Sequence, residues 1–130
     1  MPVDFHFDAA RRVIFTIFRG DIDENEIQSV PERLLHQPGF DPSFGHVIDL
    51  SEVTRLKVSA VFAQSFARQK SIFASEAKQI IVAPQDHTFG MARMAQTLRE
   101  LEIPQMKIEV VRSRQEACRM LDITFVEISS

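Results

Sequence analysis

A group of polar residues in the middle of the chain has the chemistry to bind an anion. Asp49 ends an apolar run, and Ser59 stands where a helical pattern begins. Hydroxyl and basic side chains lie between them, namely Ser51, Thr54, Arg55 and Lys57. Hydroxyls and cations beside a helix N-terminus can hold a phosphate or a carboxylate. The plainer interpretation is a solvated loop in which Asp49 accepts hydrogen bonds from nearby backbone N–H groups.

Two further residues have both a plain and a functional interpretation. Ser59 is a good helix N-cap, because its hydroxyl can accept a backbone N–H bond. At the same position it is a candidate phospho-acceptor or anion contact. His87 follows a second apolar strand and is a candidate member of the ligand loop. Its plainer interpretation is a loop histidine near the start of a helix.

The sequence contains no recognisable catalytic or metal-binding motif. His6, His36, His46 and His87 are scattered, and no pair has the spacing of a metal motif. A Ser59–His87 pair lacks a third member and an oxyanion motif. Neither the Gly-x-Ser-x-Gly pattern nor the phosphate-binding glycine loop occurs. We therefore expect no enzymatic activity, no metal and no cofactor.

Hydrophobic periodicity predicts the elements that must position these residues. Alternating patterns at 3–7 and 12–19 predict an antiparallel hairpin with a four-residue loop. Gly20 is expected to end the second strand. A short central strand at 46–50 is followed by a polar loop, 51–57, at its carboxyl end, where open α/β sheets place their ligands. Further strands are expected at 78–83 and 107–112, and helices at 23–35, 59–74, 88–102 and 113–121.

Local signals refine the helices. Asp23 with Glu26, and Ser113 with Glu116, resemble capping boxes. Pro31 predicts a kink or break, because it removes a backbone donor inside its helix. The order is ββαβαβαβα plus a tail, which predicts an α/β fold. Its sheet has about five mostly parallel strands, one antiparallel edge strand and helices packed upon it.

Size and composition restrict the class of protein. The 130 residues predict one domain, 1–130, with a core at 3–121 and an extended tail at 122–130. That tail is a candidate sixth strand or a segment that pairs with a neighbouring chain. The net charge of −3 without a basic stripe argues against nucleic acid. A single cysteine, Cys118, and no signal peptide or membrane span suggest the cytoplasm.

Phenylalanine is unusually prominent, with 11 Phe but no Trp or Tyr. The plain interpretation is a Phe-built core. The alternative is an apolar ligand cavity between the Phe-rich helix 59–74 and the Met-bearing helix 88–102. Its candidate lining residues are Phe62, Phe66, Met91 and Met94.

Three runs resemble one known family. They are VIDLSEVT at 47–54, VAPQDHTFGMARM at 82–94 and VRSRQEA at 111–117. Together with the element order, they resemble the STAS domain, and more closely the SpoIIAA-like group of small bacterial proteins. The resemblance covers about residues 3 to 121 and implies the STAS fold.

The resemblance does not extend to the phosphorylation motif of STAS antagonists. Their Asp-Ser-Ser-Gly positions fall on Lys57, Val58, Ser59 and Ala60 in this chain, so only the second serine has a counterpart. The resemblance instead implies a non-catalytic regulatory module that binds a protein partner, a second copy of itself as a homodimer, or a small apolar or anionic ligand. The alternative it implies is a carrier or sensor of an apolar ligand or lipid that associates peripherally with membranes.

Overall fold

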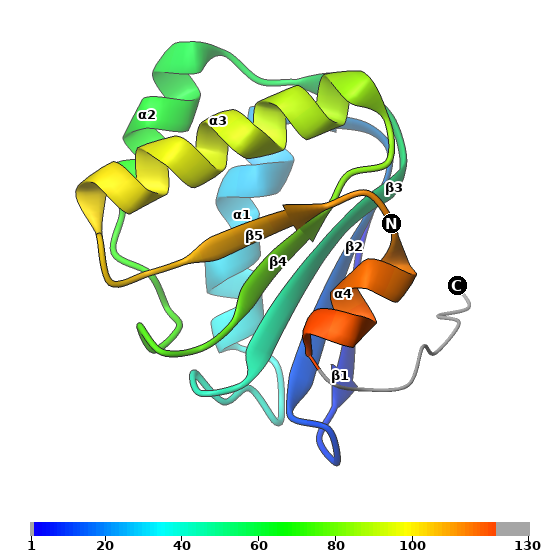
Figure 1. The fold of residues 1–130 in the computed structure, drawn as a ribbon, viewed down its shortest axis with the longest axis vertical. Helices are drawn as coiled ribbons and strands as arrows, with labels where there is room; N and C mark the ends of the chain where they lie inside the picture. The colour runs from blue at the N-terminus through cyan, green and yellow to red at the C-terminus, as the bar shows by residue number, and fades with distance from the viewer. Residues whose placement is uncertain (1, 122–130) are drawn as a thin grey trace.

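A computed structural model describes residues 2–121 of the chain (Figure 1). The predicted tail, 122–130, lies outside the described residues. Within them the element order is ββαβαβαβα, as predicted. The strands are β1 (Val3–Asp8), β2 (Val13–Asp23), β3 (Gly45–Lys57), β4 (Gln79–Val82) and β5 (Ile108–Val111). The helices are α1 (Glu24–Leu35), α2 (Ala60–Arg68), α3 (Asp86–Glu102) and α4 (Arg114–Met120).

The five strands form one sheet in the order β1-β2-β3-β4-β5. β1 and β2 are antiparallel and joined by the loop 9–12, whereas the other three pairs are parallel. The strand order therefore proceeds in one direction across the sheet. Since parallel crossovers are right-handed, the three helices that connect β2 to β5 must share one face. α4 follows the last strand and packs on the opposite face (Figure 1).

The two faces carry two apolar clusters. The larger cluster lies beneath α1, α2 and α3 and includes Ile14, Ile22 and Leu34, all fully buried. The smaller cluster lies beneath α4 and includes Val47 and Ala117. The central strands are thus buried on both sides, which explains why β4 is a continuous apolar run.

The predicted polar loop at 51–57 is wrong, because this segment continues β3. Ile22 of β2 pairs with Leu56, and Gly20 pairs with Val53. Gly20 therefore does not end its strand. It has a φ of 74° in a stretch where the β2–β3 register shifts. β4 pairs with β3 only as far as Asp49, so the remainder of β3 has no neighbouring strand on that side. Polar residues are common along such an open edge.

The predicted helix 59–74 is too long. α2 ends at Arg68, where Gln69 adopts extended backbone, and Phe73 is buried in the following segment instead. This segment is fixed by backbone bonds, including one from Ala74 N–H to the Pro42 carbonyl. Val61, in the first turn of α2, is apolar but 76% exposed.

Two further helix residues differ from what their types suggest. Leu101 is apolar but 74% exposed near the end of α3. Pro31 does not break α1, which runs from Glu24 to Leu35. Asp23 and Ser113 are the N-caps of α1 and α4, because Asp23 accepts from the N–H of Glu26 and Ser113 accepts from that of Glu116, which is the first of the two bonds of each predicted capping box.

Candidate functional site

An apolar pocket of about 210 Å³ lies between the sheet and the three helices on its larger-cluster face. It lies beside α2 and α3, the two helices between which the alternative interpretation of the phenylalanines placed a cavity. Apolar side chains predominate in its lining. They come from the strands (Phe18, Ile22, Ile48, Leu50, Leu56, Ile81, Ile108), from α1 (Ile27, Val30, Pro31, Leu34), from α2 and its flanks (Val58, Phe62, Ala63, Phe66, Ala67, Ile72, Phe73) and from α3 (Met91, Ala92, Ala95).

The four predicted pocket residues separate into two groups. Phe62, Phe66 and Met91 line the pocket. The rings of Phe62 and Phe66 stack with their centroids 5.6 Å apart, which fixes the inner surface of α2. Met94 is half-buried on α3 but is not part of the lining. Helical periodicity identified the right two helices, whereas the rotation of α3 could not be read from its sequence.

The polar lining residues were missed by the sequence analysis. They are His46, Gln69, Lys70, Ser71, Gln79 and Arg99. His46 pairs in register with Gln79, so both lie at the amino ends of their parallel strands. Arg99, in the last turn of α3, donates to the Gln69 carbonyl at 2.8 Å. The polar end of the pocket therefore lies at the amino ends of the parallel strands, whereas the ligand loop was predicted at their carboxyl ends.

His46 is a buried neutral histidine at this end of the pocket. Its Nε2 lies 2.7 Å from the Thr16 hydroxyl, and its ring stacks on Phe73 with centroids 4.6 Å apart. Burial lowers the pKa of His46 from its usual 6.5 to about 3, because no carboxylate compensates the cost of a desolvated charge. The imidazole is thus uncharged throughout the neutral range.

This histidine predicts a specific pH dependence of stability. The unfolded chain binds a proton at His46 below about pH 6.5, whereas the folded chain does not do so until about pH 3. Stability is therefore complete above pH 6.5 and falls as the pH is lowered towards 3. Between pH 7 and pH 5 the loss should be about 2 kcal/mol. Urea unfolding at both pH values measures it.

A matched pair of variants isolates this effect. His46→Gln should remove most of the loss between pH 7 and pH 5, whatever its stability at pH 7. His36→Gln, at an exposed position, should leave the loss unchanged. Carboxylates titrate mainly below this range, so they contribute little to it. An equal pH dependence in wild type and His46→Gln would refute the assignment.

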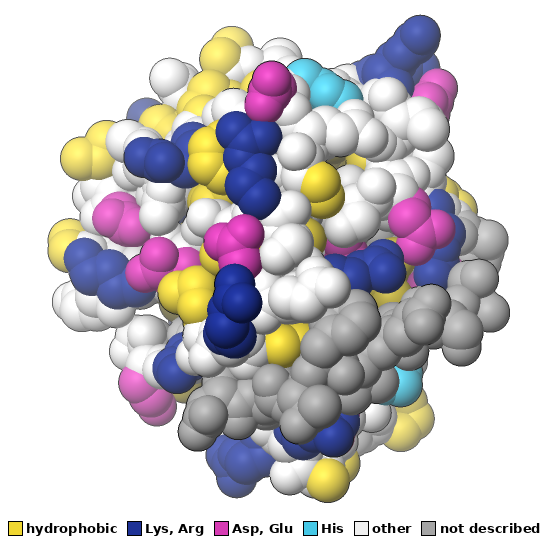
Figure 2. Space-filling view, turned by 45° about the vertical axis from the view of Figure 1, so that its right-hand side comes forward, with side chains coloured by type: hydrophobic (Ala, Val, Ile, Leu, Met, Phe, Trp, Pro, Cys, Tyr) yellow, Lys and Arg dark blue, Asp and Glu magenta, His cyan; other side chains and the backbone are white. Residues whose placement is uncertain are grey.

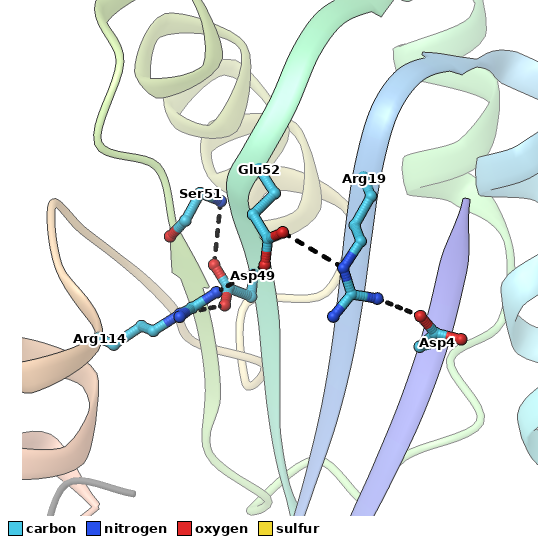
Figure 3. A network of polar contacts seen from close by, with 6 residues as sticks. All are labelled: Asp4, Arg19, Asp49, Ser51, Glu52 and Arg114. Atoms are coloured by element: carbon cyan, nitrogen blue, oxygen red, sulfur yellow. Dashed lines mark hydrogen bonds and ion pairs between the residues drawn. The ribbon is translucent and has the colours of Figure 1, made fainter. Parts of the chain in front are cut away.

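Asp49 belongs to an ion-pair network on the other face of the sheet, beneath α4 (Figure 3). Asp49 is 1% exposed, and its carboxylate accepts from the Ser51 N–H at 2.9 Å and pairs with Arg114 Nε at 2.6 Å. Arg114 also contacts Glu52, which pairs with Arg19, and Arg19 continues the network to Asp4. Burial opposes the charge on Arg114, but its carboxylate partners outweigh burial and raise the pKa of its guanidinium.

The network gives Asp49 a structural explanation. The sequence predicted that Asp49 accepts backbone N–H groups, and the Ser51 bond confirms this. Arg114 could not have been foreseen, since 65 residues separate it from Asp49. The network has three carboxylates and two guanidinium groups. This excess of negative charge does not favour an added anion.

The other residues of the predicted ligand loop lie along the exposed end of β3. Thr54 donates to the Asp21 carboxylate at 3.0 Å, and Lys57 lies 3.8 Å from the same group. Arg55 is exposed and pairs in register with Asp21. His87 is exposed in the first turn of α3. Thr54, Arg55 and Lys57 therefore lie beside Asp21 of β2, whereas His87 belongs to α3.

Ser59 is the N-cap of α2, as its plainer interpretation predicted. Its hydroxyl accepts from the Phe62 N–H at 3.1 Å. Its own N–H donates to the Glu24 carboxylate at 2.7 Å. A phosphate or other anion at this helix terminus would therefore meet a carboxylate already in place, which disfavours it electrostatically.

A solved structure resembles this chain over nearly its whole length. It is the crystal structure of an uncharacterised protein of the DUF3478 family from Shewanella loihica, described as having a SpoIIAA-like fold. The TM-score is 0.56 at 14% sequence identity, and the likeness covers 92% of this chain and 91% of that one. This chain has a SpoIIAA-like fold. The resemblance found in the sequence is thereby confirmed for the fold.

At 14% sequence identity, this likeness shows the fold alone. No protein-family model and no curated protein matches the chain. Among the helices that the structure describes, none combines the length and apolar character needed to cross a bilayer. The more specific function of this SpoIIAA-like chain must therefore be argued from its own side chains.

Proposed function

We propose that the chain is a binding module whose ligand is a small apolar molecule held between the sheet and helices α1, α2 and α3. The observation that carries the proposal is the 210 Å³ pocket, in whose lining only six residues have polar side chains. Ligand sites combine mostly apolar walls with a few placed polar groups. Protein interiors otherwise fill their space as densely as organic crystals. A ligand would thus supply the contacts that this space lacks.

The chemistry of the pocket supports binding without catalysis. His46 is held by Thr16, and burial keeps its pKa near 3, too low for a general base at neutral pH. The Ser71 hydroxyl accepts from the Phe73 N–H instead of facing a base. Among the described residues that line the pocket, no nucleophile is hydrogen-bonded to a base.

The proposal also retains the predictions about partners and location that were made from the sequence. They are a cytoplasmic location, a regulatory role, a homodimer, a protein partner and peripheral membrane association. The exposed apolar side chains of Val61 on α2 and Leu101 on α3 support contact with a membrane surface or a partner. On the face in Figure 2, acidic and basic side chains are interspersed. That distribution supports the prediction that nucleic acid is not a partner.

Calorimetric titration with 1-octanol tests the proposed function. This uncharged probe matches the apolar pocket, and burial of its chain predicts a dissociation constant on the order of 100 µM. 1-Butanol, which buries half as much chain, should bind at least 10-fold more weakly. The absence of saturable octanol binding up to its solubility limit would contradict the proposal.

A further inference from the structure

The charged side chains that line the pocket all carry positive charge. Two cationic side chains, Lys70 and Arg99, contribute to its lining, and no aspartate or glutamate does so among the described residues. Lys70 is exposed, whereas Arg99 is half-buried. Burial lowers the pKa of the Arg99 guanidinium, but arginine keeps its charge at neutral pH. A positive charge thus stands at an apolar pocket.

The hydrogen-bonding capacity of Arg99 is mostly unused. Its guanidinium has five N–H donors, and one of its nitrogens, Nη1, donates to the Gln69 carbonyl. Within residues 2–121 no carboxylate pairs with it. By contrast, Arg114 beneath α4 donates to the carboxylates of both Asp49 and Glu52. The Arg99 guanidinium therefore retains donors for an acceptor that enters the pocket.

Gln79 supplies a second unused donor in the same lining. Its Nε2 is buried and has no hydrogen-bond partner within the described residues. Such groups are rare in proteins, because a buried amide without a partner loses its bonds to water and gains nothing. Gln79 pairs in register with Ile108, whose carbonyl accepts from Gln96, and Gln96 lies one turn before Arg99 on α3. Both unused donors therefore belong to the same end of the pocket.

From these observations we infer that the ligand is a monocarboxylate with an apolar tail of about eight carbon atoms. The inference rests on the proposed function and specifies its ligand. The carboxylate contacts Arg99 and the Gln79 amide, and the tail lies against Phe62, Phe66 and Met91. A carboxylate matches a guanidinium in shape and charge and accepts two parallel N–H bonds. The tail length follows from the volume, since a cavity of about 150 Å³ holds benzene.

Titration with octanoate, 1-octanol and octylamine tests this inference, because the three probes differ only in their head groups. At pH 7.5 octanoate should bind the wild-type chain at least 10-fold more tightly than octanol, and octylamine should bind most weakly. Arg99→Gln should weaken octanoate binding at least 10-fold and change octanol binding less than 2-fold. Arg93→Gln, at an exposed position on the same helix outside the lining, should alter neither affinity.

The outcomes separate this inference from the proposed function. If octanol and octanoate bind equally, or octylamine binds best, the inference is wrong and the proposed function stands. If none of the three binds, both fail. Octanoate binding that is tight but insensitive to Arg99→Gln also refutes the assignment. Should Arg99→Gln fail to fold, Gln79→Leu decides: it should weaken octanoate binding several-fold and leave octanol binding unchanged or tighter.

Discussion

Arg114→Ala should lower the free energy of unfolding by about 3 kcal/mol, the largest stability effect we expect from a single polar substitution. The substitution leaves the carboxylate of Asp49, a residue that is 1% exposed, without its charged partner beneath α4. An unpaired buried charge is costly because the protein interior does not replace the water that the charge has lost. Arg114 is partly exposed, so water entry will moderate the loss. Urea unfolding at pH 7 measures the effect.

The double variant Asp49→Ala/Arg114→Ala should recover part of this loss, because it removes both charges together. Arg119→Ala is the matched control on the same helix, at an exposed position, and should cost less than about 0.5 kcal/mol. Additive effects in the double-variant cycle would show that Asp49 and Arg114 do not interact. The network would then have no part in holding α4 on the sheet.

Ala95→Leu should stabilise the protein by about 1–2 kcal/mol and weaken octanol binding at least 10-fold. Ala95 lines the pocket from α3, so the added isopropyl group enters space that is empty in the folded chain. Each buried methylene contributes about 0.8 kcal/mol, and filling a cavity is a common route to added stability. The same group occupies the volume that a ligand needs. Thermal unfolding and calorimetry measure the two effects.

Ala60→Leu provides the matched control, because Ala60 is exposed on α2 and lies outside the lining. It should change stability by less than about 0.5 kcal/mol and leave octanol binding unaltered. If the space beside Ala95 is already packed, Ala95→Leu will instead destabilise the chain by about 1–3 kcal/mol, as overpacked cores do. That result would remove the basis of the proposed function.

Local sequence signals predicted the fold well. Asp23 and Ser113 cap their helices as their side-chain chemistry requires, and two alternating runs predicted the hairpin, whose turn lies at 9–12, one residue later than expected. Alternation of strands and helices then fixed the parallel sheet, because crossovers are right-handed. These signals act between residues close in sequence, so one chain suffices to read them.

The segment 51–57 was wrongly predicted to be a loop, because its structure depends on residues far away in the sequence. The segment 51–57 is polar because β3 extends past the end of β4 and has an open edge there, and a solvated strand of this kind resembles a loop in sequence. Arg99 and Gln79 line the same pocket only because α3 packs on the sheet. Neither belongs to a motif, so the sequence contained no signal for the polar end of the pocket.

The most direct test of the central claim is an NMR titration of protein labelled with ¹³C at its methionine methyl groups. Met91 lines the pocket, whereas Met120 is exposed on α4 at the opposite face of the sheet. With 1-octanol, the Met91 methyl should shift in a saturable manner and show intermolecular NOEs to the octyl chain, while Met120 stays unchanged. Saturable shifts at Met120 without any at Met91 would contradict the account, as would an unchanged spectrum at saturating octanol.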